Sequence, residues 1–175
     1  MTTYLCTEPM SDQEQEGNWV QVAGTLDTIV FPGVDSCLAV IYFLANGGMV
    51  GGHVGIMWPG ERFPSPRNAN KLLHAMTGQL IARSNDRVDK IIFIGDIENN
   101  AMENDWQIED LQRVCKTTLD GNRQFVTLNK STGSITIVCN GAARRLEIYR
   151  NTQDLSRQVY SEAFNTVAGD RRLPD

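Results

Sequence analysis

The residues best suited to chemistry are a cysteine and a histidine within one glycine-rich segment. The chain of 175 residues contains four cysteines and two histidines. Cys37 and His53 both lie in the stretch GVDSCLAVIYFLANGGMVGGHVGIMWPG. A thiol with an ordinary pKa of about 8.5 is mostly protonated at neutral pH, and a neighbouring imidazole that accepts its proton is the usual means of activation. The segment therefore indicates a nucleophilic thiol at Cys37 with His53 as its base.

The other histidine and cysteines are expected to be structural. His74 falls on a predicted helix and has no cysteine or carboxylate three or four positions away. Cys115 lies on an apolar helical face and Cys139 at a strand end, while Cys6 belongs to a polar leader. Because no Cys-x-x-Cys pair occurs, the spacing predicts neither a disulfide framework nor a zinc site. We expect no metal and no cofactor.

Two predicted strands, residues 36–44 and 49–58, must position the reactive pair. An Asn-Gly turn at residues 46 and 47 predicts a hairpin that pairs residues whose numbers sum to 93. His53 would then face Val40, about 10 Å along the strand from Cys37. For the thiol and the imidazole to face each other directly, the numbers of facing residues would have to sum to about 90.

Two glycines offer a way to repair this register. Gly51 and Gly52 directly precede His53. A β-bulge there would shift the pairing and re-aim the imidazole. Alternatively, the two glycines form a wide turn or allow another part of the backbone to approach.

The order of the remaining elements predicts the fold class. Apolar periodicity indicates two further helices besides the one at residues 67–82, and short apolar runs indicate strands. The further helices are expected at residues 105–119 and 151–168, and the strands at residues 19–23, 25–31, 90–94, 125–128, 134–139 and 145–149. This order predicts an α+β (α/β) fold with mixed, mainly antiparallel β-sheets flanked by helices. Residues 1–18 are expected to be a loosely held polar leader, and 19–175 a single globular domain.

Composition excludes several classes of protein. Hydrophobic residues make up 41% of the chain and charged residues 21%, which is typical of a globular domain. The net charge is -5 and the basic residues are scattered, so we expect no nucleic-acid partner. The sequence shows no secretory signal peptide and no apolar stretch of about 20 residues, so we expect no membrane insertion and a cytoplasmic location. Export into a host or target cell by a signal-independent route stays open.

The reactive segment resembles the chemoreceptor glutamine deamidase family, CheD. That family's motif runs Gly-Ser-Cys, a strand of small and branched residues, Gly-Gly-Met, then a histidine and a strand ending in proline. The corresponding elements in this chain are Asp35-Ser36-Cys37, Leu38 to Leu44, Gly47-Gly48-Met49, His53 and Pro59. The deamidase domains of cytotoxic necrotizing factor and related bacterial toxins share a similar cysteine and histidine placement.

Two positions depart from the family motif. The family has a threonine six positions before its cysteine, where this chain has Phe31, which has no group to hydrogen-bond an imidazole. Asp35, Thr28 or a main-chain carbonyl are the alternatives for orienting the histidine. His53 follows Met49 by four positions, whereas the family's histidine follows by two.

The resemblance implies a cysteine amidohydrolase that deamidates glutamine or asparagine side chains of a protein substrate. Cys37 would attack the carboxamide carbon and His53 would carry the proton to the leaving ammonia. The N–H groups of Cys37 and of the preceding turn, with Ser36 among the candidates, would bind the oxyanion. The alternatives are a non-catalytic protein–protein interaction domain of the same fold, and a small-molecule amidase or transferase that uses the same pair.

Overall fold

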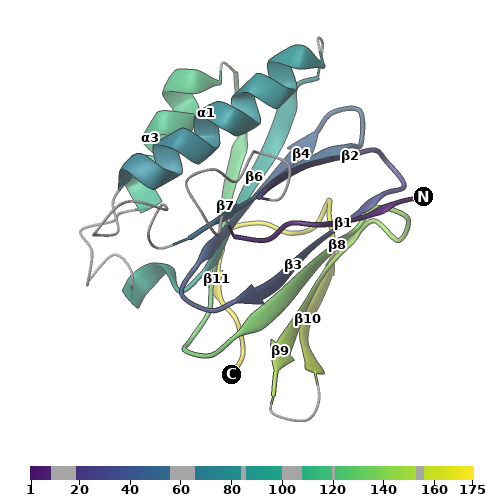
Figure 1. The fold of residues 1–175 in the computed structure, drawn as a ribbon, viewed down its shortest axis with the longest axis vertical. Coiled ribbons are helices and arrows are strands. Elements are labelled where there is room, and N and C mark those ends of the chain that lie inside the picture. Colours follow the sequence, from purple (N-terminus) through teal and green to yellow (C-terminus); the bar gives the residue numbers. More distant parts are fainter. Residues whose placement is uncertain (9–18, 56–65, 84–85, 100–107, 120, 153–155) are drawn as a thin grey trace.

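The chain folds into two β-sheets and one layer of helices (Figure 1). The computed structural model describes all residues except 9–18, 56–65, 84–85, 100–107, 120 and 153–155. Strands dominate, and the two long helices lie together on one side of the molecule. The α+β fold with mixed sheets, predicted from the sequence, is confirmed. None of the described helices is both long and apolar enough to cross a lipid bilayer.

The first sheet has five strands in the spatial order β1-β3-β8-β9-β10. Strand β1 runs parallel to β3, and the other neighbours are antiparallel. The bounds are β1 Thr3–Leu5, β3 Thr28–Val34, β8 Ile135–Asn140, β9 Arg145–Asn151 and β10 Ser156–Ala163.

The second sheet has six strands in the order β11-β7-β6-β4-β5-β2. The strand pairs β6 with β7 and β7 with β11 are parallel, whereas β2, β5, β4 and β6 form an antiparallel array. The bounds are β2 Val20–Ala23, β4 Leu38–Leu44, β5 Met49–Val54, β6 Val88–Gly95, β7 Gln124–Asn129 and β11 Asp170–Arg172. Helix α1, Pro66–Ala82, links β5 to β6, and helix α3, Ile108–Thr118, precedes β7.

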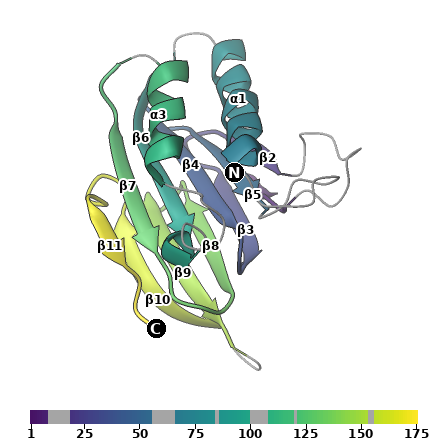
Figure 2. The same ribbon diagram turned by 90° about the vertical axis from the view of Figure 1, so that its left-hand side faces the viewer.

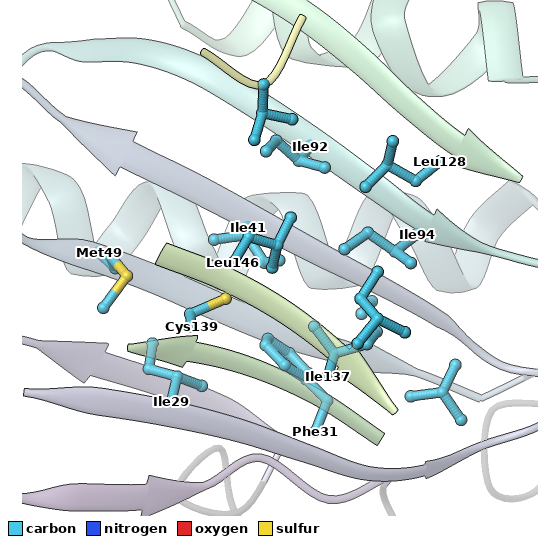
Figure 3. Close-up of a cluster of buried hydrophobic side chains, with 14 of the residues drawn as sticks. Ile29, Phe31, Ile41, Met49, Ile92, Ile94, Leu128, Ile137, Cys139 and Leu146 are labelled. Atoms are coloured by element: carbon cyan, nitrogen blue, oxygen red, sulfur yellow. The ribbon is translucent and has the colours of Figure 1, made fainter. Parts of the chain in front are cut away.

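Both faces of the second sheet are covered, so the molecule has three layers. Helices α1 and α3 cover one face (Figure 2). The first sheet packs on the other face, and side chains from both sheets interdigitate there (Figure 3). Strand β4 is buried along its whole length because its residues alternate between these two cores. This explains its continuous apolar sequence, which is typical of a strand covered on both faces.

The hairpin of β4 and β5 has a register that differs by one residue from the prediction. Facing residues sum to 92, so His53 lies opposite Ala39. The cause is a three-residue loop, in which Gly47 has a φ of 91° and the Asn46 side chain accepts a hydrogen bond from the Gly48 N–H at 2.8 Å. A turn followed by a left-handed residue is a common three-residue hairpin loop.

Gly51 and Gly52 do not form the predicted bulge, since pairing continues through both without a shift. They admit neighbouring side chains instead. A Cβ on Gly51 would lie 2.7 Å from the Phe31 ring, and one on Gly52 would lie 2.6 Å from a methyl group of Leu72 on α1. The two glycines therefore let the first sheet and the helix approach β5 closely.

The predicted C-terminal helix at residues 151–168 is wrong. The four-residue apolar rhythm that suggested it coincides with strand β10, which pairs antiparallel with β9. The pairing shifts register between Gln158 and Tyr160, and Val159 and Tyr160 both pack on the core between the sheets. Tertiary packing of a β-branched and an aromatic residue thus overrides the helical pattern. Residues 153–155 lie outside the described part of the chain.

The prediction of a loosely held leader is also wrong for residues 3–6. Residues Thr3–Leu5 form β1 against β3, and Cys6 is fully buried. The N–H of Cys6 continues the pairing by donating to the Val30 carbonyl at 2.7 Å. Residues 9–18 of the predicted leader, and residues 56–58 of the predicted strand, lie outside the described residues.

Candidate functional site

The structure brings Cys37 and His53 together at one end of the second sheet. His53 pairs with Ala39, and Cys37 stands two residues before Ala39, so both side chains point to the same face. Diagonal neighbours of this kind in adjacent strands are within reach of each other's side chains. The Cys37 sulfur and a ring nitrogen of His53 lie within 4.8 Å of one another. The two groups therefore come within 4.8 Å of each other as diagonal neighbours, without the direct pairing considered from the sequence.

A main-chain carbonyl orients the imidazole. His53 Nδ1 lies 2.9 Å from the carbonyl oxygen of Cys6. The Trp19 carbonyl accepts hydrogen bonds from the His53 N–H at 2.8 Å and from the Cys6 thiol at 3.2 Å, which ties these segments together. With Nδ1 donating to the carbonyl, the lone pair is on Nε2, and Nε2 has no hydrogen-bond partner among the described residues.

A carboxylate lies beside the thiol. Cys37 Sγ donates a hydrogen bond to Glu8 Oε2 at 2.8 Å. This contact stabilises the protonated thiol, and the negative charge opposes the thiolate. Burial lowers the pKa of His53 below its usual range, while the Cys6 carbonyl and the Glu8 charge act in the opposite direction. The pair is almost enclosed: Cys37 is 5% exposed and His53 2%.

The side chains considered as alternative orienting groups do not supply the hydrogen bond that orients His53. Thr28 is at the start of β3, paired with Asn140, and about 10 Å along the strand from Phe31. Asp35 and Ser36 are exposed in the turn between β3 and β4. Of the three options left open by the sequence, the main-chain carbonyl is the one hydrogen-bonded to His53.

Phe31 packs beside the imidazole that it cannot hydrogen-bond. The two ring centroids are 6.3 Å apart and the rings are tilted by 54°. Phe31 is fully buried between the sheets. Its apolar ring adds to the desolvation that favours the neutral imidazole.

A buried lysine lies at the same end of the second sheet. Lys130 follows β7 directly and is 1% exposed, with Nζ donating to the carbonyls of Ser131 and Gly133 at 3.2 and 2.7 Å. Burial lowers its pKa, and the charge of Asp96 partly opposes this. A thiolate at Cys37 also favours the charged form of Lys130, so the two groups are electrostatically linked.

Of the remaining cysteines, Cys6 contributes its main-chain carbonyl to this site, whereas Cys115 lies in the other core, between the helices and the second sheet. None of the four cysteines forms a disulfide. Burial raises the pKa of Cys115, next to the Tyr42 hydroxyl, to about 11, and raises that of Cys139 further still. His74 is exposed on α1.

Sequence reasoning missed Glu8, the Cys6 carbonyl and Lys130 as neighbours of the pair. Strand β1 has only three residues, which is too short for a periodic pattern to reveal. The available signal was the apolar Tyr-Leu-Cys run at residues 4–6 within an otherwise polar stretch. No sequence pattern indicated that Lys130 is buried, because its burial depends on the turn that follows β7.

Similarity to known proteins is found among solved structures. No family model matches the chain, and no curated protein matches it. Among solved structures, the chain is similar to the crystal structure of the C-terminal domain of CNFy from Yersinia pseudotuberculosis, with a TM-score of 0.42 and 12% sequence identity. The match covers 85% of this chain and 54% of that one, so the chain spans about half the length of that structure.

Proposed function

We propose that the protein is a cysteine amidohydrolase in which Cys37 is the nucleophile and His53 is the base. The observation that carries the proposal is the placement of His53 between a thiol and a carbonyl. Its Nδ1 is 2.9 Å from the Cys6 oxygen, and one of its ring nitrogens is within 4.8 Å of the Cys37 sulfur. A nucleophile, a base and a group that orients the base are the parts that covalent acyl transfer requires.

The reaction relays two protons through one imidazole, one in each half of the cycle. His53 removes the proton from the Cys37 thiol, and the sulfur attacks the carboxamide carbon to give a tetrahedral oxyanion. Collapse of that intermediate breaks the carbon–nitrogen bond, and the imidazolium protonates the departing ammonia. Water, deprotonated by His53, then attacks the thioester carbon. Collapse of this second intermediate breaks the carbon–sulfur bond and releases a carboxylic acid, and the imidazolium returns its proton to the sulfur.

The Cys37 thiol is covered in this structure. Glu8 accepts the hydrogen bond of Cys37, and a substrate carboxamide must replace this contact to reach the sulfur. Displacement of the carboxylate would also remove the negative charge that opposes the thiolate. We expect the Glu8 side chain to move when substrate binds, while the Cys6 carbonyl stays on His53.

The substrate we propose is a glutamine or asparagine side chain of a protein. The support is the resemblance of the Asp35-Ser36-Cys37 to His53 segment to the chemoreceptor glutamine deamidases. The enclosed position of the thiol also suits a side chain that projects from a protein surface better than a main-chain amide. The positive charge of Lys130, at the same end of the sheet, would stabilise developing negative charge.

Alkylation kinetics test the proposed pair without knowledge of the substrate. Iodoacetamide labelling of Cys37 at pH 7, followed by peptide mass spectrometry, should slow about tenfold or more in a His53→Ala variant, because the thiol loses its base. His74→Ala is the matched control and should leave the rate unchanged. Equal rates in wild type and His53→Ala would remove the basis of the proposal.

Ammonia release tests the reaction class. Purified protein incubated with glutamine-rich proteins should release ammonia and convert specific glutamines to glutamates, and Cys37→Ser should abolish both. Release from free glutamine alone would favour the small-molecule amidase instead. If a partner protein binds wild type and Cys37→Ser equally and no ammonia forms, the interaction-domain alternative is favoured.

A further inference from the structure

The site contains three side chains that are common ligands of transition metals. Glu8, Cys37 and His53 each offer one ligand atom, and these atoms all lie within 4.8 Å of one another. They come from three places in the chain: the segment after β1, the residue before β4, and β5. We propose that this cluster binds a soft divalent cation, with Zn²⁺ as the preferred ion.

An unsatisfied nitrogen points independently to a ligand. His53 is 2% exposed, yet its Nε2 has no hydrogen-bond partner among the described residues. Buried polar atoms nearly always have a partner, so an orphan of this kind requires an explanation. A cation bound through the Nε2 lone pair supplies one.

The second ring nitrogen has the arrangement that metal-bound histidines usually show. Nδ1 lies 2.9 Å from the carbonyl oxygen of Cys6. A hydrogen bond from one ring nitrogen to a carbonyl fixes the tautomer and leaves the other nitrogen as the ligand. The neutral imidazole is the form that binds a metal, and the hydrogen bond at Nδ1 leaves the Nε2 lone pair for that purpose.

The donor set selects the ion. Sulfur, imidazole nitrogen and carboxylate oxygen are all established zinc ligands, whereas calcium and magnesium prefer oxygen alone. Tetrahedral zinc with these ligands places the donor atoms roughly 3.3 to 3.6 Å apart. Glu8 Oε2 and Cys37 Sγ are 2.8 Å apart, and the other separations in the cluster are at most 4.8 Å, so the side chains must adjust to bind the ion. Glu8 is exposed and therefore has room to shift.

Bound zinc would change the electrostatics of the thiol. Glu8 disfavours the Cys37 thiolate, but a dication between the two groups favours it and releases the thiol proton to solvent. The sulfur is then a metal ligand and is not available for attack. Zinc would therefore act as a reversible inhibitor of the proposed hydrolase, although its binding does not depend on that activity.

Metal titration of the purified protein tests this inference. After chelator treatment and dialysis, Zn²⁺ should bind with one-to-one stoichiometry by calorimetry, and Co²⁺ should give a sulfur-to-cobalt charge-transfer band. Cys37→Ser and His53→Gln should weaken binding by about 100-fold or more, and Glu8→Gln by about tenfold. His74→Gln and Cys115→Ala are the matched controls and should bind as wild type does.

A second test measures how well Zn²⁺ protects the Cys37 thiol in the wild-type protein, so it does not depend on whether a variant folds. Stoichiometric Zn²⁺ should slow iodoacetamide labelling of Cys37 at least about tenfold, and a chelator should restore the rate. Zinc binding that survives Cys37→Ser, or labelling unaffected by Zn²⁺, overturns the zinc site. If labelling nonetheless depends on His53, the hydrolase proposal stands while the zinc site fails.

Discussion

Two buried thiols of the same core differ in what surrounds them. Cys37 and Cys139 both belong to the apolar cluster between the two sheets, and they are 5% and 0% exposed. Cys139 lies among Ile29, Met49 and Leu146 (Figure 3). Cys37 instead donates to Glu8 and lies near His53. A cysteine that is only buried behaves as a small hydrophobic residue. Polar neighbours at a strand end can make its thiol reactive.

The location of each thiol along its strand explains the difference. Cys139 is inside β8, paired on both sides by neighbouring strands of the first sheet. Cys37 precedes β4, and its thiol donates to Glu8, which lies three residues after β1. Polar groups can gather where a sheet ends, because the backbone there supplies carbonyls that the strand ladder does not use.

The largest expected difference is in alkylation of the folded protein. Cys37 should react with iodoacetamide at least about 100-fold faster than Cys139, because burial raises the pKa of Cys139 and each pKa unit lowers the thiolate fraction tenfold. Peptide mass spectrometry on the same sample measures both rates. Similar rates would mean that the surroundings of Cys37 do not distinguish it.

Serine substitution should separate the two sites by stability. Cys139→Ser places a hydroxyl in the apolar core and should lower the free energy of unfolding by about 1–3 kcal/mol. Cys37→Ser should cost less than about 1 kcal/mol, because the hydroxyl can donate to Glu8 as the thiol does. Urea unfolding monitored by circular dichroism compares the variants. A larger loss at Cys37 would contradict the polar description of its site.

The smallest expected effect comes from the carboxylate. Glu8→Gln removes the charge that opposes the Cys37 thiolate and should speed its labelling about three- to tenfold, with no change at Cys139. Glu98→Gln, an exposed ion-pair residue whose partner is Arg172, is the matched control. Slower labelling in Glu8→Gln would indicate that Glu8 helps to activate the thiol instead.

Local patterns predicted most of the strands and helices that carry the site. The runs that became β4, β5 and β6 are strongly apolar, and α1 shows clear helical spacing, so each element was recognisable from a few neighbouring residues. The helix expected at residues 151–168 failed because its weak rhythm also fits a strand packed against β9. Strands β1 and β11 have three residues each and form only when longer strands offer an edge.

The candidate pair was found from residue type, and its environment was not. Two histidines and one glycine-rich segment reduce the choice to Cys37 and His53. Glu8 and the Cys6 carbonyl are separated from them by 29 and 47 residues respectively, through contacts that no local pattern encodes. The pairing of β4 with β5, in which the numbers of facing residues sum to 92, likewise depended on the conformation of the loop at Asn46 and Gly47.

Periodicity and composition therefore established an α+β chain with a cysteine and a histidine on adjacent strands, because these features are set by side-chain type at short range. Packing of the two sheets decided the rest. It placed Glu8 beside the thiol, gave the imidazole its carbonyl partner and left Nε2 without one among the described residues. These are long-range contacts, and their energy depends on burial that exists only once the whole chain has folded.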